Sequence, residues 1–350
     1  MKTLSSVFKR ITNFRLFLPL LCLALVLIVN LIQTPSFFEI TIQNGVFYGF
    51  IIDILNLSSR LIIMAVGMTL VVASSGGTDI SVGAVSALAG AVCVAVLGTG
   101  ESYQMPYYVS ILLALLIGVI CGAMNGFLVS YMKVQPMVAT LILLTAGRGI
   151  AQLVTGSFIL YVKPAEFGYL GAFLPGVPIP TPCFVAIFVV LVTWLILKKT
   201  AFGMYIESIG INRKASRLVG LNSKLIMLLT YVFCGVCAAC AGLISVSRTS
   251  SIDANNVGKY AELDAILAVA IGGNSLAGGK FSLMGSVIGA ITIQALTTTL
   301  YAMHVSADQL PLYKAVVVII IVALQSPVLI KWVRSFTGNF LPAKVAKEAN

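Results

Sequence analysis

The sequence is poor in charged residues. Asp, Glu, Lys and Arg make up 9% of its 350 residues, whereas a soluble domain carries about a quarter. One histidine and 11 acidic residues leave little material for a catalytic triad, a metal site or a proton relay in a bilayer. These shortages argue against a water-soluble globular enzyme. No catalytic residue, metal ligand or cofactor is predicted.

The seven cysteines form no evident disulfide framework, because almost all lie inside apolar runs where they behave as small hydrophobic residues. Cys234, Cys237 and Cys240 recur every third residue, which also allows a soft-metal site. No His, Asp or Glu lies within that run, so helix packing is the favoured interpretation.

Long apolar runs are abundant. Hydrophobic residues make up 59% of the chain and the mean hydropathy is +1.05. Since a helical span needs about 20 apolar residues, the sequence predicts an all-α, polytopic membrane bundle of about ten transmembrane helices in one domain, residues 1–350. The expected spans lie near 15–33, 60–75, 79–98, 107–131, 136–155, 181–198, 224–246, 263–277, 283–303 and 312–331. The run 263–277 is short and contains Gly272 and Gly273, so it is either a full span or a re-entrant segment.

The formal charge of +11 indicates membrane topology rather than nucleic-acid binding, because basic residues alternate with apolar runs of bilayer-spanning length. A cytoplasmic N-terminus places 16 of the 22 lysines and arginines inside; the other six are Arg60, Arg148, Lys163, Arg248, Lys259 and Lys314. The positive-inside rule therefore predicts that both termini are cytoplasmic.

Two glycine-rich segments predict breaks in the helices and echo one another weakly. Gly76 and Gly77 precede Asp79, which is placed to cap the next helix, and Gly272 and Gly273 follow a second span. Internal duplication is common among transporters. Small residues also recur every fourth position, as in Gly118, Gly122 and Gly126 and in Gly285 and Gly289, which predicts close helix packing.

Several polar residues within the predicted spans are candidates for a hydrated translocation path, because burial in lipid without a partner is costly. Hydrogen bonding between helices is the alternative role. Arg148 is the strongest candidate, since a charge at that depth usually faces a cavity or a partner. The candidates are Asn125, Thr140, Arg148, Gln152 and Gln294.

The longest predicted cytoplasmic connection, residues 198–223, offers a docking segment. Asn212 is placed to cap a short helix that ends at Gly220, with Ala215 and Leu218 on one face. Residues 274–281 look briefly like a phosphate-binding loop, but Asn274 and Phe281 stand where that motif needs Gly and Ser or Thr. With neither an ATPase motif nor an ion relay, the protein is expected to take its energy from a partner.

Three motifs in order resemble the ribose/xylose-type permease family of bacterial ABC importers. They are GMTLV from Gly67 with GGTDISVG from Gly76, FGMYIESIGINRKASRLVG from Phe202, and ELDAILAVAIGGNSLAGG from Glu262. The resemblance implies a non-catalytic, multi-pass subunit of the bacterial inner membrane. It also implies three kinds of partner: a cytoplasmic ABC ATPase, a second permease chain, identical or paralogous, and a periplasmic sugar-binding protein.

Further stretches, including IDILN from Ile52 and DANN from Asp253, resemble galactofuranose-importer permeases. This implies import of a monosaccharide, with galactofuranose or another furanose or pentose as candidates. A self-sufficient channel or secondary carrier for a small polar solute is the alternative. The resemblance places ATPase coupling in 198–223, at Glu207, Gly210, Asn212, Arg213, Ala215, Arg217 and Gly220. Two positions depart from the usual family pattern: Thr78, where an apolar residue is usual, and Ser216, which follows Ala215 where many relatives have two alanines.

Overall fold

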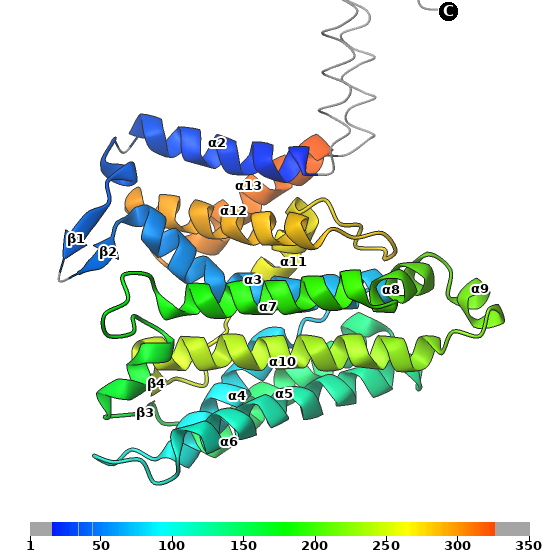
Figure 1. The fold of residues 1–350 in the computed structure, drawn as a ribbon, viewed down its shortest axis with the longest axis horizontal. Coiled ribbons are helices and arrows are strands. Elements are labelled where there is room, and N and C mark those ends of the chain that lie inside the picture. Colours follow the sequence, from blue (N-terminus) through cyan, green and yellow to red (C-terminus); the bar gives the residue numbers. More distant parts are fainter. Residues whose placement is uncertain (1–15, 34, 44, 326–350) are drawn as a thin grey trace, which may run out of the picture. The chain divides into compact units, whose positions relative to one another are not determined.

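The computed structural model describes residues 16–33, 35–43 and 45–325, so the basic N-terminal residues and the end of the expected span 312–331 lie outside it. The chain divides into two compact units, residues 1–299 and 300–350, and each is described by itself. The described residues are mainly helical, as Figure 1 shows.

Ten α-helices lie wholly within the described part of the first unit. They are α2 (Phe17–Gln33), α3 (Phe50–Ser75), α4 (Val82–Leu97), α5 (Tyr107–Ser130), α6 (Pro136–Thr155), α7 (Thr181–Lys199), α8 (Phe202–Ile211), α9 (Arg213–Leu218), α10 (Ser223–Thr249) and α11 (Ala261–Ile271). An eleventh, α12 (Leu283–Ala302), continues into the second unit, which contains α13 (Leu310–Gln325).

Short elements connect the helices. The 3-10 helices are η1 (Pro35–Phe38) and η2 (Ala165–Leu170). Strand β1 (Thr41–Gln43) pairs antiparallel with β2 (Val46–Tyr48), and β3 (Leu160–Tyr161) pairs antiparallel with β4 (Ser251–Ile252). The second pair joins the α6–α7 connection to the α10–α11 connection.

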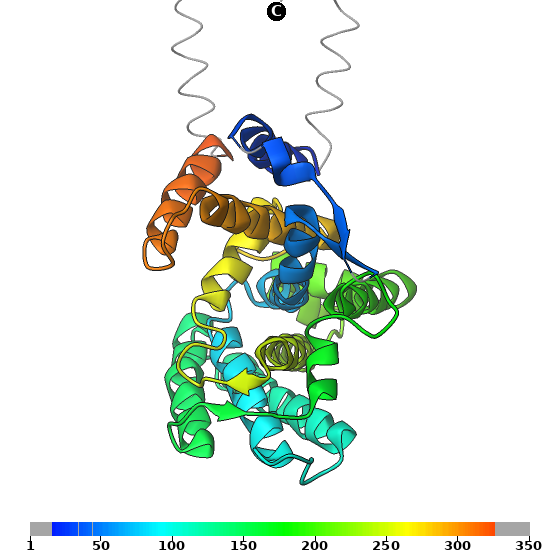
Figure 2. The ribbon, with the colours of Figure 1, turned by 90° about the vertical axis from the view of Figure 1, so that its left-hand side faces the viewer.

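Helix α10 is central to the first unit and packs against α3, α4 and α5, as the end-on view in Figure 2 shows. Small residues allow this close approach. A Cβ on Gly118 of α5 would lie 2.5 Å from the carbonyl oxygen of Gly235 in α10. A Cβ on Gly126 would lie 3.0 Å from Cα of Leu228 in α10, so the predicted packing role of this glycine stripe is confirmed.

The cysteines of α10 also pack. A Cβ on Gly67 of α3 would lie 2.9 Å from Cα of Cys234 and 3.1 Å from Cβ of Cys237. Both cysteines are buried. Their three-residue spacing therefore places small side chains along the α3–α10 contact.

Six described helices are long and apolar enough to cross a bilayer: α3, α5, α6, α7, α10 and α12. The chain is thus an all-α, multi-pass membrane protein. Helix α3 begins at Phe50, ten residues before the predicted start at 60, and α11 ends after 11 residues at Ile271. The predicted run 263–277 is therefore a short helix followed by irregular backbone.

Candidate functional site

The first helix break follows α3. Gly76 adopts φ +66°, and its N–H donates to the Val72 carbonyl, which ends the helix. Helix α4 begins at Val82 with Ser81 at its N-cap. Asp79 does not cap it as predicted: its Oδ1 accepts the N–H of Ser81 at 2.9 Å and the hydroxyl of Ser81 at 2.6 Å. The buried carboxylate therefore stabilises the turn before the helix.

The second break follows α11 and is organised by the side chain of Asn274. Its Nδ2 donates to the hydroxyl of Ser286 in α12 at 2.8 Å, and its Oδ1 accepts the N–H of Ser282. Ser286 also accepts from Thr69 of α3 at 2.6 Å. One buried amide thus connects the irregular segment to two long helices.

The two breaks contact each other through backbone atoms. The N–H of Gly279 donates to the Ala73 carbonyl at 3.0 Å, and a Cβ on Gly76 would lie 2.8 Å from the Ala277 carbonyl oxygen. Ala73 is in the last turn of α3, where carbonyls lack partners within the helix. We call residues 73–77 and 277–279 together the break junction.

Helix α8 lies directly against the break junction. A Cβ on Gly210 would lie 2.5 Å from the Gly279 nitrogen and closer still to the Ala73 carbonyl oxygen. The side chain of Ile211 comes within 3.2 Å of the Cβ position of Gly279. The absence of a side chain at position 210 therefore lets three backbone segments meet.

Helix α9 presents an exposed apolar surface. Asn212 is its N-cap and accepts the N–H groups of Lys214 and Ala215, which confirms the predicted start. Gly220 follows the helix with φ +85°. Leu218 at the end of α9 is 90% exposed and Val219 directly after it is 76% exposed, so the described part of the chain leaves these two large apolar side chains uncovered.

The two arginines of α9 contact α10. Arg213 contacts Sδ of Met227, and Nε of Arg217 donates to the Ser223 hydroxyl at 2.8 Å. Partial burial lowers the pKa of Arg213, with a smaller contribution from the charge of Arg217. Glu207 of α8 instead lines a cavity beside α7 and α12. The seven predicted coupling residues thus share one segment but face different surroundings.

The five predicted path residues lie in three separate places, each defined by its hydrogen-bond partners. Asn125 donates to Ser81 at 2.9 Å and Thr140 accepts from the Ile80 N–H at 3.2 Å, so both contact the segment after the first break. Nε2 of Gln294 donates a hydrogen bond to the hydroxyl of Thr298 within α12. The remaining two, Arg148 and Gln152, lie one turn apart on α6.

Arg148 and Gln152 both bind the connection before α11. Nη1 of Arg148 donates to the carbonyls of Ala254, Asn255 and Val257 at 2.9, 3.0 and 3.1 Å. Nε2 of Gln152 donates to the side chain of Asn255. The sequence could not identify this connection as the partner of Arg148 and Gln152, because about a hundred residues separate the two segments.

Comparison with known proteins assigns the chain to a family. A family profile described as the branched-chain amino acid transport system permease component matches residues 50–324. The broken-helix bundle therefore belongs to the class of membrane transport permeases. The chain is a member of this permease family, and the family membership that its motifs indicated is confirmed.

Curated relatives cover most of the chain. It is 44% identical over 323 residues to the galactofuranose transporter permease protein YtfT of Escherichia coli (strain K12), covering 90% of this chain and 92% of that one. The fructose import permease protein FruF of Bifidobacterium longum (strain NCC 2705) is 40% identical, covering 81% and 80%. The ribose import permease protein RbsC of E. coli (strain K12) is 37% identical, covering 86% and 91%.

Proposed function

We propose that this chain is the membrane-spanning permease subunit of an ABC importer for a monosaccharide. Its family membership and its similarity to galactofuranose, fructose and ribose permeases support this function over a self-sufficient channel or carrier. A furanose or pentose is the proposed substrate class. Hydrolysis of ATP is assigned to a partner ATPase, and the chain itself is proposed to be non-catalytic.

The observation that carries the proposal is the position of α8 and α9. Leu218 and Val219 offer apolar surface for a partner, while Gly210 of the preceding helix packs against the break junction. A force applied by the ATPase to α9 would reach both broken helices through α8. Residues 198–223 are accordingly proposed to be the coupling segment.

The proposed assembly lies in the bacterial inner membrane. It has two permease chains, a cytoplasmic ABC ATPase and a periplasmic sugar-binding protein. About ten membrane-crossing or re-entrant helices with both termini in the cytoplasm remain the proposed topology, supported by the distribution of basic residues.

Ala215 provides the test. It is exposed on α9, and its small side chain suits close insertion into an ATPase groove. We expect Ala215→Glu and Ala215→Trp to weaken ATPase co-purification, or to uncouple ATP hydrolysis from sugar uptake, while membrane insertion stays normal. The same two substitutions at Ser102, which is exposed between α4 and α5, are the control. Normal ATPase association and sugar uptake in both Ala215 variants would refute the coupling assignment.

A further inference from the structure

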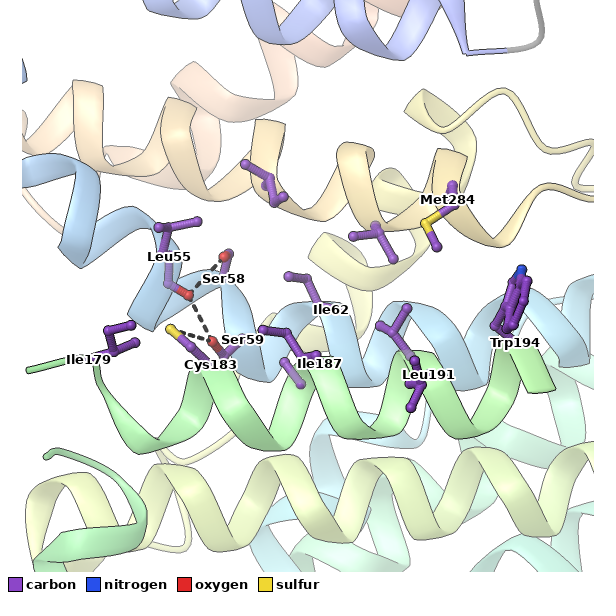
Figure 3. A pocket seen from close by; sticks show the side chains of 14 residues that line it. Leu55, Ser58, Ser59, Ile62, Ile179, Cys183, Ile187, Leu191, Trp194 and Met284 are labelled. Carbon is purple, nitrogen blue, oxygen red and sulfur yellow. Dashed lines mark hydrogen bonds between the residues drawn. The ribbon is translucent and has the colours of Figure 1, made fainter. Parts of the chain in front are cut away.

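A deep apolar groove runs between α3, α7 and α12, with a volume of about 700 Å³. Figure 3 shows Trp194 and Met284 at one end and Leu55 and Cys183 toward the other. Its volume lies within the range of about 300–1,000 Å³ typical of small-molecule sites. The groove is therefore large enough for a ligand of lipid-chain size.

The serine hydroxyls of the groove already donate hydrogen bonds within α3. The hydroxyls of Ser58 and Ser59 donate to the Leu55 carbonyl at 3.0 and 2.7 Å, and Ser59 lies 3.6 Å from Sγ of Cys183. Each serine has a single hydroxyl proton and donates it to the Leu55 carbonyl, so neither serine retains a donor for a polar solute such as a sugar. The groove suits a hydrocarbon occupant.

A second cavity of about 520 Å³ adjoins the groove, since Trp194 and Met284 line both. Lys198 of α7 and Glu207 of α8 also line this second cavity. In the described part of the chain, no ion pair joins these two charges. The cavity thus offers one positive and one negative group, each available to a ligand carrying both charges.

The length of the groove matches one lipid chain. Cys183 and Trp194 are eleven residues apart on α7, which corresponds to about 16 Å at a rise of about 1.5 Å per residue. A bilayer's hydrocarbon core is about 30 Å thick, so this distance is about one leaflet. Trp194 then lies where apolar groove meets charged cavity, the amphipathic boundary that Trp favours.

We propose that this chain binds one phosphatidylethanolamine-type lipid in the groove and its adjoining cavity. One acyl chain occupies the groove. In the cavity, Lys198 pairs with the phosphate, and the carboxylate of Glu207 accepts hydrogen bonds from the ethanolamine ammonium. The inference depends on α7 being a membrane span and not on which sugar or ATPase the importer uses.

The two separate charges of the cavity favour a lipid over a second copy of the chain. A helix with its side chains is about 10–12 Å wide and would cover the groove without filling it. It would also leave Lys198 and Glu207 without assigned partners. A zwitterionic lipid satisfies the groove and both charges at once.

The test is native mass spectrometry of the full-length, delipidated chain in detergent, titrated separately with palmitoyl-oleoyl phosphatidylethanolamine, phosphatidylglycerol and phosphatidylcholine. We expect one ethanolamine lipid to bind per chain, about tenfold more tightly than either other lipid. Phosphatidylglycerol lacks the ammonium and phosphatidylcholine has no N–H donors. Glu207→Gln should remove the preference for ethanolamine over glycerol, and Val190→Trp, which fills the groove, should abolish binding.

Phe188→Trp and Lys199→Ala are matched controls, because these residues are exposed on α7 but line neither cavity. Both should bind the ethanolamine lipid like the unmodified chain. Equal affinity for all three lipids would overturn the proposal, as would full binding by Val190→Trp. If Val190→Trp separates dimers without changing lipid binding, the groove is an interface between copies. Each of these results is obtained without ATPase or sugar, so it is independent of the proposed transport function.

Discussion

Two buried threonines near the first helix break differ in their hydrogen bonds. The hydroxyl of Thr78 is buried and has no partner among the described residues, whereas Thr140 donates to the Pro136 carbonyl and accepts the Ile80 N–H. An unsatisfied buried hydroxyl costs about 1–3 kcal/mol. Thr78→Val should therefore raise the free energy of unfolding by about 1 kcal/mol, seen as a higher melting temperature in detergent.

Thr140→Val is the matched control, because it removes a hydroxyl that has partners and leaves the Ile80 N–H without an acceptor. It should lower the melting temperature. If both variants shift the melting temperature in the same direction, the hydrogen-bond assignment at Thr78 is wrong.

Arg148 binds three carbonyls of the connection before α11, and this defines its expected role. Arg148→Ala should reduce sugar uptake about tenfold or more, since several carbonyls lose a charged donor. Arg148→Lys should restore uptake only in part, because an ammonium cannot reproduce the guanidinium fork. Uptake per assembled importer is the measurement, with Thr145→Val on the same helix as control. Full uptake by a normally assembled Arg148→Ala variant would remove this residue from the proposed path.

At the scale of elements, the contact between α8 and the break junction is the most constrained feature. Gly210→Ala would place a methyl group against the backbone of Ala73 and Gly279, which cannot move aside as a flexible side chain can. We expect normal membrane insertion, a loss of uptake of at least about tenfold, and ATP hydrolysis that no longer responds to sugar.

Gly149→Ala is the control for this helical glycine, because a Cβ there would meet no atom within 4 Å. It should transport like the unmodified chain. Should Gly210→Ala also transport normally, α8 would not transmit motion to the broken helices.

At the scale of the whole molecule, the charge distribution predicts which connections face the cytoplasm. Leu218 and Phe158 are 90% and 77% exposed and lie in connections expected on opposite sides of the membrane. In intact cells, an impermeant thiol reagent should label Phe158→Cys and should label Leu218→Cys only after permeabilisation. Labelling of Leu218→Cys from the periplasm would invert the topology.

Much of this architecture can be predicted from apolar runs and glycine positions. The predictions that failed did so for physical reasons. The predicted start of α3 was too late because Asp53 and Asn56 interrupt the apolar run. In the structure the helix continues through this region, and the hydroxyls of Ser58 and Ser59 donate hydrogen bonds to its backbone. Asn212 was recognised because capping depends on neighbouring residues alone.

The contacts that build the candidate site are long-range and have no local signature. Gly210 occurs in a recognisable motif, but nothing near it in the chain identifies Ala73 and Gly279 as its neighbours. Likewise, Arg148 was selected as a charge within a span, while its carbonyl partners depend on how a distant connection folds back. Sequence pattern located the helices and their breaks, and tertiary packing determined which of them meet.

The hydrogen bond between Gly279 and Ala73 joins main-chain atoms only. Ala73 already carries the side chain that an alanine scan introduces, and Gly279 has no side chain to remove, so truncating side chains removes neither bonded atom. The Gly279 amide proton is nevertheless exchangeable with solvent deuterium once the bond opens. Its exchange rate therefore reports on how often the two broken helices separate, and comparing the rate with and without bound ATPase would show whether the ATPase changes that separation.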